Sequence, residues 1–327
     1  MTAWICATTA RHQVEWLLAA WSRDERARVL NVVRRLAFLH PELEESARVI
    51  ECAPDERLER LAIEPGSILW TKVTLKDFEN IAIHCLDGQR IEPDPEHVRQ
   101  IAARLQSRPP TYPRIHRDDP WLRKPFGGKI VFEEYTEKAN ELLSQALEII
   151  SQILPSLLAE IRLMDSDIQF VVDPTAHPDK AVSFSDNCVP GALYVSIRTS
   201  KGFIDPLLLA ESIIHEHRHQ KLYLLQRHVT LVEDDSIRVP SPWREDPRPP
   251  SGLLHALFVF VQLHDYWTKL TSGPQQLANH DRCAREAHEI GCRLNAGFIT
   301  LSGTPLTPRG RELAALLERK FQNQTSQ

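Results

Sequence analysis

Two proline-rich stretches interrupt a chain whose apolar residues are otherwise spaced mainly for α-helix. Residues 108–128 hold five prolines and end in Gly127-Gly128, and residues 233–252 hold five more. Proline fixes φ and lacks a backbone donor, so neither stretch can continue a regular helix. We therefore predict a helical N-terminal lobe over 1–120 and a second domain over 121–327.

The elements on either side follow from hydrophobic periodicity. Residues 13–39 are patterned as one long helix or a helical hairpin. Further helices are predicted over 55–61, 96–105, 133–158, 206–226, 253–270 and 309–321, and short strands over 168–172, 181–184 and 192–197. The predicted class is α+β, mainly α-helical, with the 206–226 helix packed on a small sheet.

The composition limits the classes of binding partner and the cellular compartment that we expect for this protein. Hydrophobic residues at 42%, charged residues at 25% and a net charge of -5 are ordinary for a globular protein and argue against nucleic-acid and anionic-membrane partners. No segment approaches the roughly 20 apolar residues that a membrane-spanning helix needs. The six cysteines form no CxxC pair, which favours free thiols and a cytoplasmic location. The sequence does not indicate an oligomeric state.

The segment His215-Glu216-His217-Arg218-His219 lies within the predicted 206–226 helix. Residues four apart share a helix face, so His215 and His219 can direct two imidazoles at one metal ion, with Glu216 beside them. This is the HExxH pattern of metalloenzymes. We expect His217 to point away from the metal and to face solvent.

A catalytic metal needs a third ligand, and the chain offers several candidates. The metzincin extension fails because Leu222 and Leu225 stand where glycine and histidine are required. Glu233 or Glu245 could serve as in gluzincins, although both lie in the second proline-rich stretch.

The apolar helix that follows this stretch contains two histidines that could also be the third ligand. His255 is surrounded by apolar residues at the start of 253–270, where an unpaired imidazole would be unfavourable. It is the preferred third ligand, and its competing interpretation is a hydrogen-bonded core histidine. His264 is the weaker candidate because it lies roughly half a turn from that face.

Two arginines precede His255 in the proline-stiffened loop. A guanidinium group can bind a carboxylate through two parallel hydrogen bonds. Arg244 is interpreted as surface charge paired with Glu245 and Asp246. Arg248, flanked by prolines next to the apolar helix, is the better anchor for an acidic cosubstrate.

Several elements together resemble the HExxH-motif peptide-modifying proteins that accompany ribosomally made natural-product precursors. The resemblance covers roughly residues 181–317 and lies in the order and spacing of the elements. The matching elements are Ala210 to His219, Pro190 to Ser196, Arg248 to His255 followed by Phe260 and Trp267, and Leu306 to Gly310.

This resemblance implies an iron(II) and 2-oxoglutarate dependent oxygenase that hydroxylates a side chain of a precursor peptide at its β carbon. His215, His219 and His255 would ligate iron, and Arg248 would pair with the distal carboxylate of 2-oxoglutarate. Glu216 could then orient a ligand, hold a water or help bind substrate. The 1–120 lobe becomes a candidate for peptide recognition.

Two further hypotheses remain. In a zinc metallopeptidase, Glu216 would be the general base, and the 192–196 strand would align an extended substrate by strand addition. In a non-catalytic module, the N-terminal lobe would bind a leader peptide or a partner enzyme. The intact His-Glu-His set argues against the second hypothesis.

Overall fold

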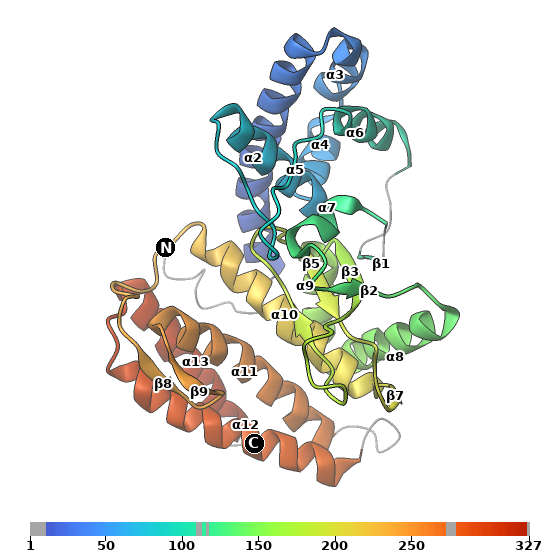
Figure 1. The fold of residues 1–327 in the computed structure, drawn as a ribbon. Coiled ribbons are helices and arrows are strands. Elements are labelled where there is room, and N and C mark those ends of the chain that lie inside the picture. The colour runs from blue at the N-terminus through green and yellow to red at the C-terminus, as the bar shows by residue number, and fades with distance from the viewer. Residues whose placement is uncertain (1–10, 109–112, 116–117, 273–278, 326–327) are drawn as a thin grey trace. The chain divides into compact units, whose positions relative to one another are not determined.

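The protein is mainly helical, with small sheets between its helices, as the sequence predicts. The structure is a computed structural model that describes residues 11–108, 113–115, 118–272 and 279–325 (Figure 1). Within these residues, no helix combines the length and the apolar character needed to cross a membrane. The α+β, mainly α-helical class is confirmed.

The chain forms two compact units, and neither is continuous in sequence. Unit 1 is built mainly from Thr136–Glu160 and Phe203–Gln327, and unit 2 from Val14–Tyr135 and Ile161–Gly202. The chain therefore changes unit after residues 13, 135, 160 and 202. The boundary expected at residue 120 coincides with none of these crossings.

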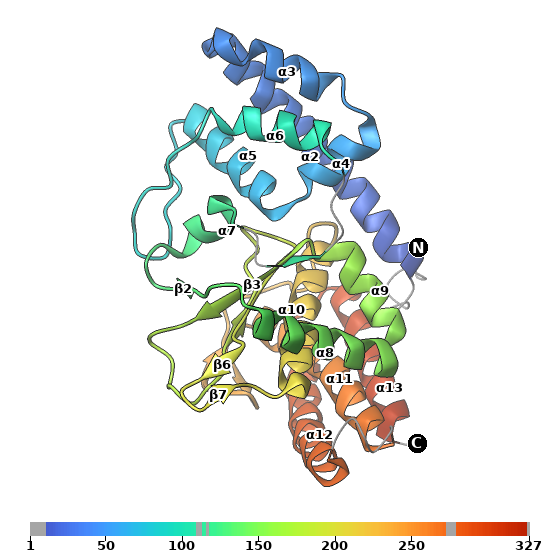
Figure 2. The same ribbon diagram turned by 90° about the vertical axis from the view of Figure 1, so that its right-hand side faces the viewer.

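Unit 2 begins with a layer of helices, coloured blue to teal in Figures 1 and 2. The helix α2 is one long helix, not a hairpin, and it buries apolar side chains three and four residues apart, which is the spacing of one helix face. The α-helices of this layer are α2 (Arg11–Leu39), α3 (Glu44–Glu51), α4 (Asp55–Ala62), α5 (Pro65–Phe78), α6 (His97–Gln106) and α7 (Pro120–Arg123).

A five-stranded sheet completes unit 2, in the order β1-β3-β5-β4, with β2 antiparallel to β3. The strand β3 pairs in parallel with both β1 and β5, and β4 runs antiparallel to β5. Since β5 is paired on both sides, the expectation that it aligns a substrate by strand addition is wrong. The strands are β1 (Arg114–Ile115), β2 (Val131–Phe132), β3 (Asp167–Val172), β4 (Ser183–Phe184) and β5 (Ala192–Val195).

Unit 1 is a bundle around α11 (Pro250–Thr271), which packs against α8, α10, α12 and α13. Its apolar residues are buried along its length, as expected of a helix enclosed by others. Figures 1 and 2 show α11, α12 and α13 side by side in orange and red. The remaining bundle helices are α8 (Glu137–Ile153), α10 (Pro206–Gln226), α12 (His280–Ser302) and α13 (Pro308–Thr325).

The helix α10 carries the HExxH segment and matches its predicted range. The Asp205 carboxylate caps it by accepting a 2.8 Å hydrogen bond from the backbone N–H of Leu207, and Pro206 occupies the first turn, where no backbone donor is required. The sheet belongs to unit 2 and α10 to unit 1, so the expected packing of the helix on the sheet stays a prediction.

A backbone clamp joins the chain after α10 to the start of α13 within unit 1. The N–H of Thr307 donates to the Leu231 carbonyl at 3.1 Å, and the N–H of Glu233 donates to the Pro305 carbonyl at 2.8 Å. Gly310 makes this approach feasible, because a Cβ atom there would lie 1.9 Å from the Leu231 oxygen. The Leu306 to Gly310 element therefore has a structural role.

Three local predictions were wrong. The 133–158 helix is two helices, α8 and α9 (Pro155–Met164), because Pro155 interrupts the hydrogen-bond ladder. No helix was predicted over residues 65–78, which form α5; its first seven residues are all buried, so this part of the helix has no amphipathic period. The second proline-rich stretch contains a hairpin, β8 (Val239–Ser241) and β9 (Arg244–Arg248).

Candidate metal centre

The first turn of the HExxH segment brings His215 and His219 together on α10. Their Nε2 atoms lie 3.2 Å apart. One metal ion bound at about 2.1 Å from each nitrogen can span this separation. The two residues that the sequence places on one helix face are therefore also close enough to share an ion.

Both imidazoles are held in the neutral form that binds metals. Burial, together with the nearby His219 and the positive charge of Arg244, lowers the pKa of His215 to about 3. Burial also lowers the pKa of His219 to about 4. The His215 side chain is still 29% exposed, so an ion or ligand can reach it from solvent. The pair therefore needs no deprotonation at neutral pH to bind a metal.

His255 adjoins the same pair, but at the opposite nitrogen of His219. Its Nδ1 lies 3.2 Å from Nδ1 of His219, and its Nε2 lies 2.9 Å from Oε1 of Gln226. His255 is therefore placed to orient the His219 ring. Residues that hydrogen-bond to the second ring nitrogen of a metal-bound histidine act in this way.

These contacts also fix which nitrogen of each ring carries the proton. The amide oxygen of Gln226 accepts a hydrogen bond from Nε2–H of His255, which leaves Nδ1 of that ring as an acceptor. His219 then donates from Nδ1 to His255, and its own Nε2 is left with a lone pair. With the amide oxygen of Gln226 facing His255, the Nε2 lone pair of His219 is therefore directed toward His215.

Across the described ranges, no group of three or more histidine, cysteine, aspartate or glutamate side chains is arranged to hold a metal ion. The two Nε2 atoms are close enough to serve as two ligands of one ion. The three-ligand set that includes His255 stays a prediction.

Glu216 lies beside the pair and is only 2% exposed. Its Oε1 is 3.9 Å from Nε2 of His215. A buried carboxylate at this distance can hold a water molecule or a substrate group next to an ion bound by the pair.

His217 does not face solvent, and that prediction was wrong. Its side chain is fully buried, and its Nε2 lies 2.8 Å from Oε1 of Glu160. Lys221 donates to the other oxygen of Glu160 at 2.7 Å. Although burial raises the pKa of Glu160, the charge of Lys221 and the hydrogen bond from His217 hold it at about 2. This buried ionic group anchors α10 on the side away from the histidine pair.

The hairpin β8–β9 contributes an aromatic wall and an arginine. Between its strands, Trp243 stacks on Phe260 with ring centroids 4.7 Å apart, and Phe260 meets His215 edge-on at 5.6 Å. Arg244 follows directly, and its charge acts on His215. Of the two arginines considered from the sequence, Arg244 is thus the one whose charge acts on His215. The pairing of Arg248 with a cosubstrate stays a prediction.

The remaining candidates from the sequence lie in different surroundings. Oε1 of Glu233 lies 3.7 Å from Nη1 of Arg311, next to the clamp. Glu245 is exposed on β9. His264 is a core histidine, with Nδ1 2.8 Å from Oε1 of Gln324 and its ring edge-on to Phe321. The described cysteines are all free thiols.

Sequence reasoning missed Gln226 and Trp243. Gln226 lies seven residues after His219, which is the spacing of one helix face, so a search of that face could have found it. Trp243 lies in a loop-like, proline-rich segment and carries no comparable signal.

Comparison with known proteins does not assign a family. No protein-family model matches the sequence, and no curated protein matches it significantly.

Proposed function

We propose that this protein is an iron(II) and 2-oxoglutarate dependent oxygenase that hydroxylates the β carbon of a side chain in a ribosomally synthesised peptide. The observation that carries the proposal is the neutral pair His215 and His219, with Nε2 atoms 3.2 Å apart and a solvent-accessible edge. Imidazole nitrogens suit iron(II) as they suit zinc. The choice of iron rests on the family resemblance of residues 181–317.

Each neighbouring residue has a defined task in this proposal. His215 and His219 would hold the iron, which when bound supplies dioxygen activation coupled to oxidation of 2-oxoglutarate. His255 and Gln226 keep Nε2 of His219 available. The ring of Phe260 covers one side of His215 and limits water there.

A positively charged residue is needed for the second carboxylate of 2-oxoglutarate, and β9 offers two. Arg248 is the residue that the resemblance indicates, and Arg244 is the one whose charge acts on His215. Replacing each by glutamine and measuring the 2-oxoglutarate affinity of the iron-loaded protein identifies the anchor. We expect a loss of about tenfold to a hundredfold for the anchoring arginine and little change for its neighbour.

A zinc metallopeptidase is the second candidate, and the position of Glu216 favours it. A buried carboxylate 3.9 Å from a ligand nitrogen suits a general base that activates metal-bound water. The two candidates share their ligands and differ in the metal and in the task of Glu216.

Anaerobic metal loading separates the two candidates. Metal-free protein is given iron(II) and then 2-oxoglutarate, and the visible charge-transfer band of the chelate is sought. We expect the band in the native protein and its absence in His219→Ala. If no band forms, while zinc binds tightly and Glu216→Gln abolishes peptide cleavage, the oxygenase proposal is refuted.

A further inference from the structure

A cavity of about 420 Å³ in unit 2 lies apart from the histidine pair in sequence and has no task in the proposed reaction. Its size is within the range of ligand-binding sites. Arginines dominate its lining, and they are Arg57, Arg60, Arg104, Arg108 and Arg114. Of the described residues that line it, two are acidic, Glu56 and Glu64. In a protein with a net charge of -5, this is a local excess of positive charge.

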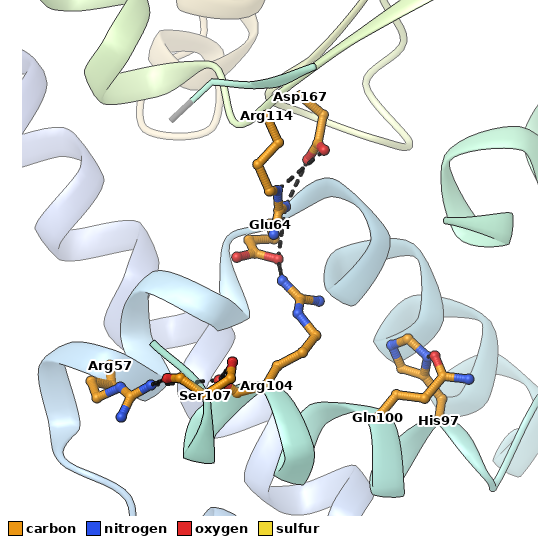
Figure 3. A network of polar contacts seen from close by, with 8 residues as sticks. All are labelled: Arg57, Glu64, His97, Gln100, Arg104, Ser107, Arg114 and Asp167. Atoms are coloured by element: carbon orange, nitrogen blue, oxygen red, sulfur yellow. Dashed lines mark hydrogen bonds and ion pairs between the residues drawn. The ribbon is translucent and has the colours of Figure 1, made fainter. Parts of the chain in front are cut away.

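Two of the five arginines are held by internal carboxylates (Figure 3). Glu64, which is 2% exposed, lies between the guanidinium groups of Arg104 and Arg114. Arg114 also binds the buried Asp167, with Nη2 2.8 Å and Nε 3.3 Å from its oxygens. These pairs form a rigid floor and show that the cavity accommodates a carboxylate between two arginines.

The charges of Arg57 and Arg108 are not neutralised in this way by any residue that the structure describes. Arg57 donates from Nη2 to the Ser107 carbonyl, which fixes the side chain without cancelling its charge. Among the described residues, neither Arg57 nor Arg108 forms an ion pair with a carboxylate. A guanidinium group has five N–H donors, so Arg57 has donors to spare after this contact.

Leucine side chains complete the lining, through Leu61 of α4 and Leu105 of α6. Both leucines belong to the hydrophobic core of unit 2 and present only a small apolar edge to the cavity, with which a bare phosphate ion would make no favourable contact. A peptide that carries acidic side chains together with apolar ones satisfies both kinds of wall.

We propose that this cavity binds an acidic segment of a peptide, with aspartate or glutamate carboxylates on Arg57 and Arg108 and an apolar side chain on Leu61 and Leu105. The inference rests on the proposed function in taking the ligand to be a peptide. It places a recognition site in unit 2 for the substrate whose modification is assigned to α10.

Fluorescence anisotropy with the full-length, metal-free protein tests the proposal. The probe is a short labelled peptide in which glutamate alternates with leucine, and the reference is the same peptide with glutamine in place of glutamate. We expect the glutamate peptide to bind at least about tenfold more tightly, with an affinity that falls as salt screens the charges.

Variants locate the binding. The double variant Arg57→Gln/Arg108→Gln should weaken binding of the glutamate peptide by about tenfold or more. Arg108→Gln alone replaces an exposed side chain and should still weaken it measurably without disturbing the fold. The matched control is Arg48→Gln, which removes one exposed arginine of α3 in the same unit and should leave the affinity within about twofold.

Three results would overturn the inference. One is equal binding of the two peptides. Another is an effect of Arg48→Gln as large as that of the double variant. The third is a site that takes inorganic phosphate, with phosphate bound tightly at Arg57 and Arg108 and no preference between the peptides. Because the assay needs no metal, His219→Ala should bind the peptide normally, so a failure of the iron experiment and a failure of this one are distinguishable.

Discussion

The Oε2 atom of Glu160 accepts a hydrogen bond from Nζ of Lys221 at 2.7 Å, and both side chains are buried. The two residues are 61 positions apart and join α9 to the helix that carries the histidine pair. A buried ion pair is strongly destabilised when one partner is removed, because the other charge then remains in a poorly solvating environment.

Replacement of Glu160 by glutamine should therefore destabilise the protein by roughly 3 to 5 kcal/mol, measured as a shift of the urea unfolding transition. The control is Glu141→Gln, which breaks the exposed Lys138 pair on α8 and should hardly move the transition. Similar shifts for the two variants would show that the buried pair contributes no more stability than the exposed pair.

Glu211 should give the protein a distinctive pH dependence. Burial, assisted by the negative charge of Glu286, raises its pKa to about 7 against the opposing influence of Trp267 and Arg282. The pKa in the folded protein is above the ordinary value of 4.5, so the stability contributed by the protonated form is complete below pH 4.5 and lost as the pH rises through 7.

Between pH 5 and pH 8, native protein should accordingly lose on the order of 1 to 3 kcal/mol more stability than Glu211→Gln, which cannot ionise. The measurement compares the urea midpoints of the two proteins at both pH values. The effects of the other titrating groups are common to both proteins and therefore cancel. Parallel pH profiles would contradict the assignment.

His255 and Gln226 should tune metal binding. If His255 orients His219, His255→Ala should weaken cobalt(II) affinity by about tenfold to a hundredfold, and Gln226→Leu by a smaller factor in the same direction. His219→Ala should remove binding. A loss in His255→Ala as complete as that in His219→Ala would instead make His255 the third ligand, as expected from the sequence.

Gly310 should tolerate no side chain. In a helix, alanine normally stabilises relative to glycine by about 1 kcal/mol, but here its Cβ would meet the Leu231 carbonyl oxygen at 1.9 Å. Gly310→Ala should cost about 3 kcal/mol or more. Gly303→Ala is the matched control, because its Cβ would be 3.7 Å from the nearest atom. A Gly310→Ala protein as stable as the control would mean that the backbone at the clamp can shift with little loss of stability.

The sequence predicted features that depend on local signals. The bounds of α10 follow from Asp205, Pro206 and the apolar spacing, and the meeting of His215 and His219 follows from helix geometry. Features that depend on tertiary contacts were not predictable. The side chain of His217 is buried because of Glu160, a residue 57 positions away.

Helix α5 and the arginine-lined cavity illustrate the same limit. The burial of its first seven residues removes the amphipathic period by which the start of α5 could be recognised. The cavity gathers residues from α4, α6 and β1, and each of its arginines resembles an ordinary surface residue when the sequence is considered alone.

The backbone clamp between the chain after α10 and the start of α13 has a consequence for how the protein is made. When α10 emerges from the ribosome, Glu160 is already available to it, whereas His255 is translated later and the α13 half of the clamp later still. A nascent chain therefore exposes the two histidines before their tautomers and surroundings are set. The backbone bonds that join α13 to the chain after α10 can likewise form only once residue 307 has been translated.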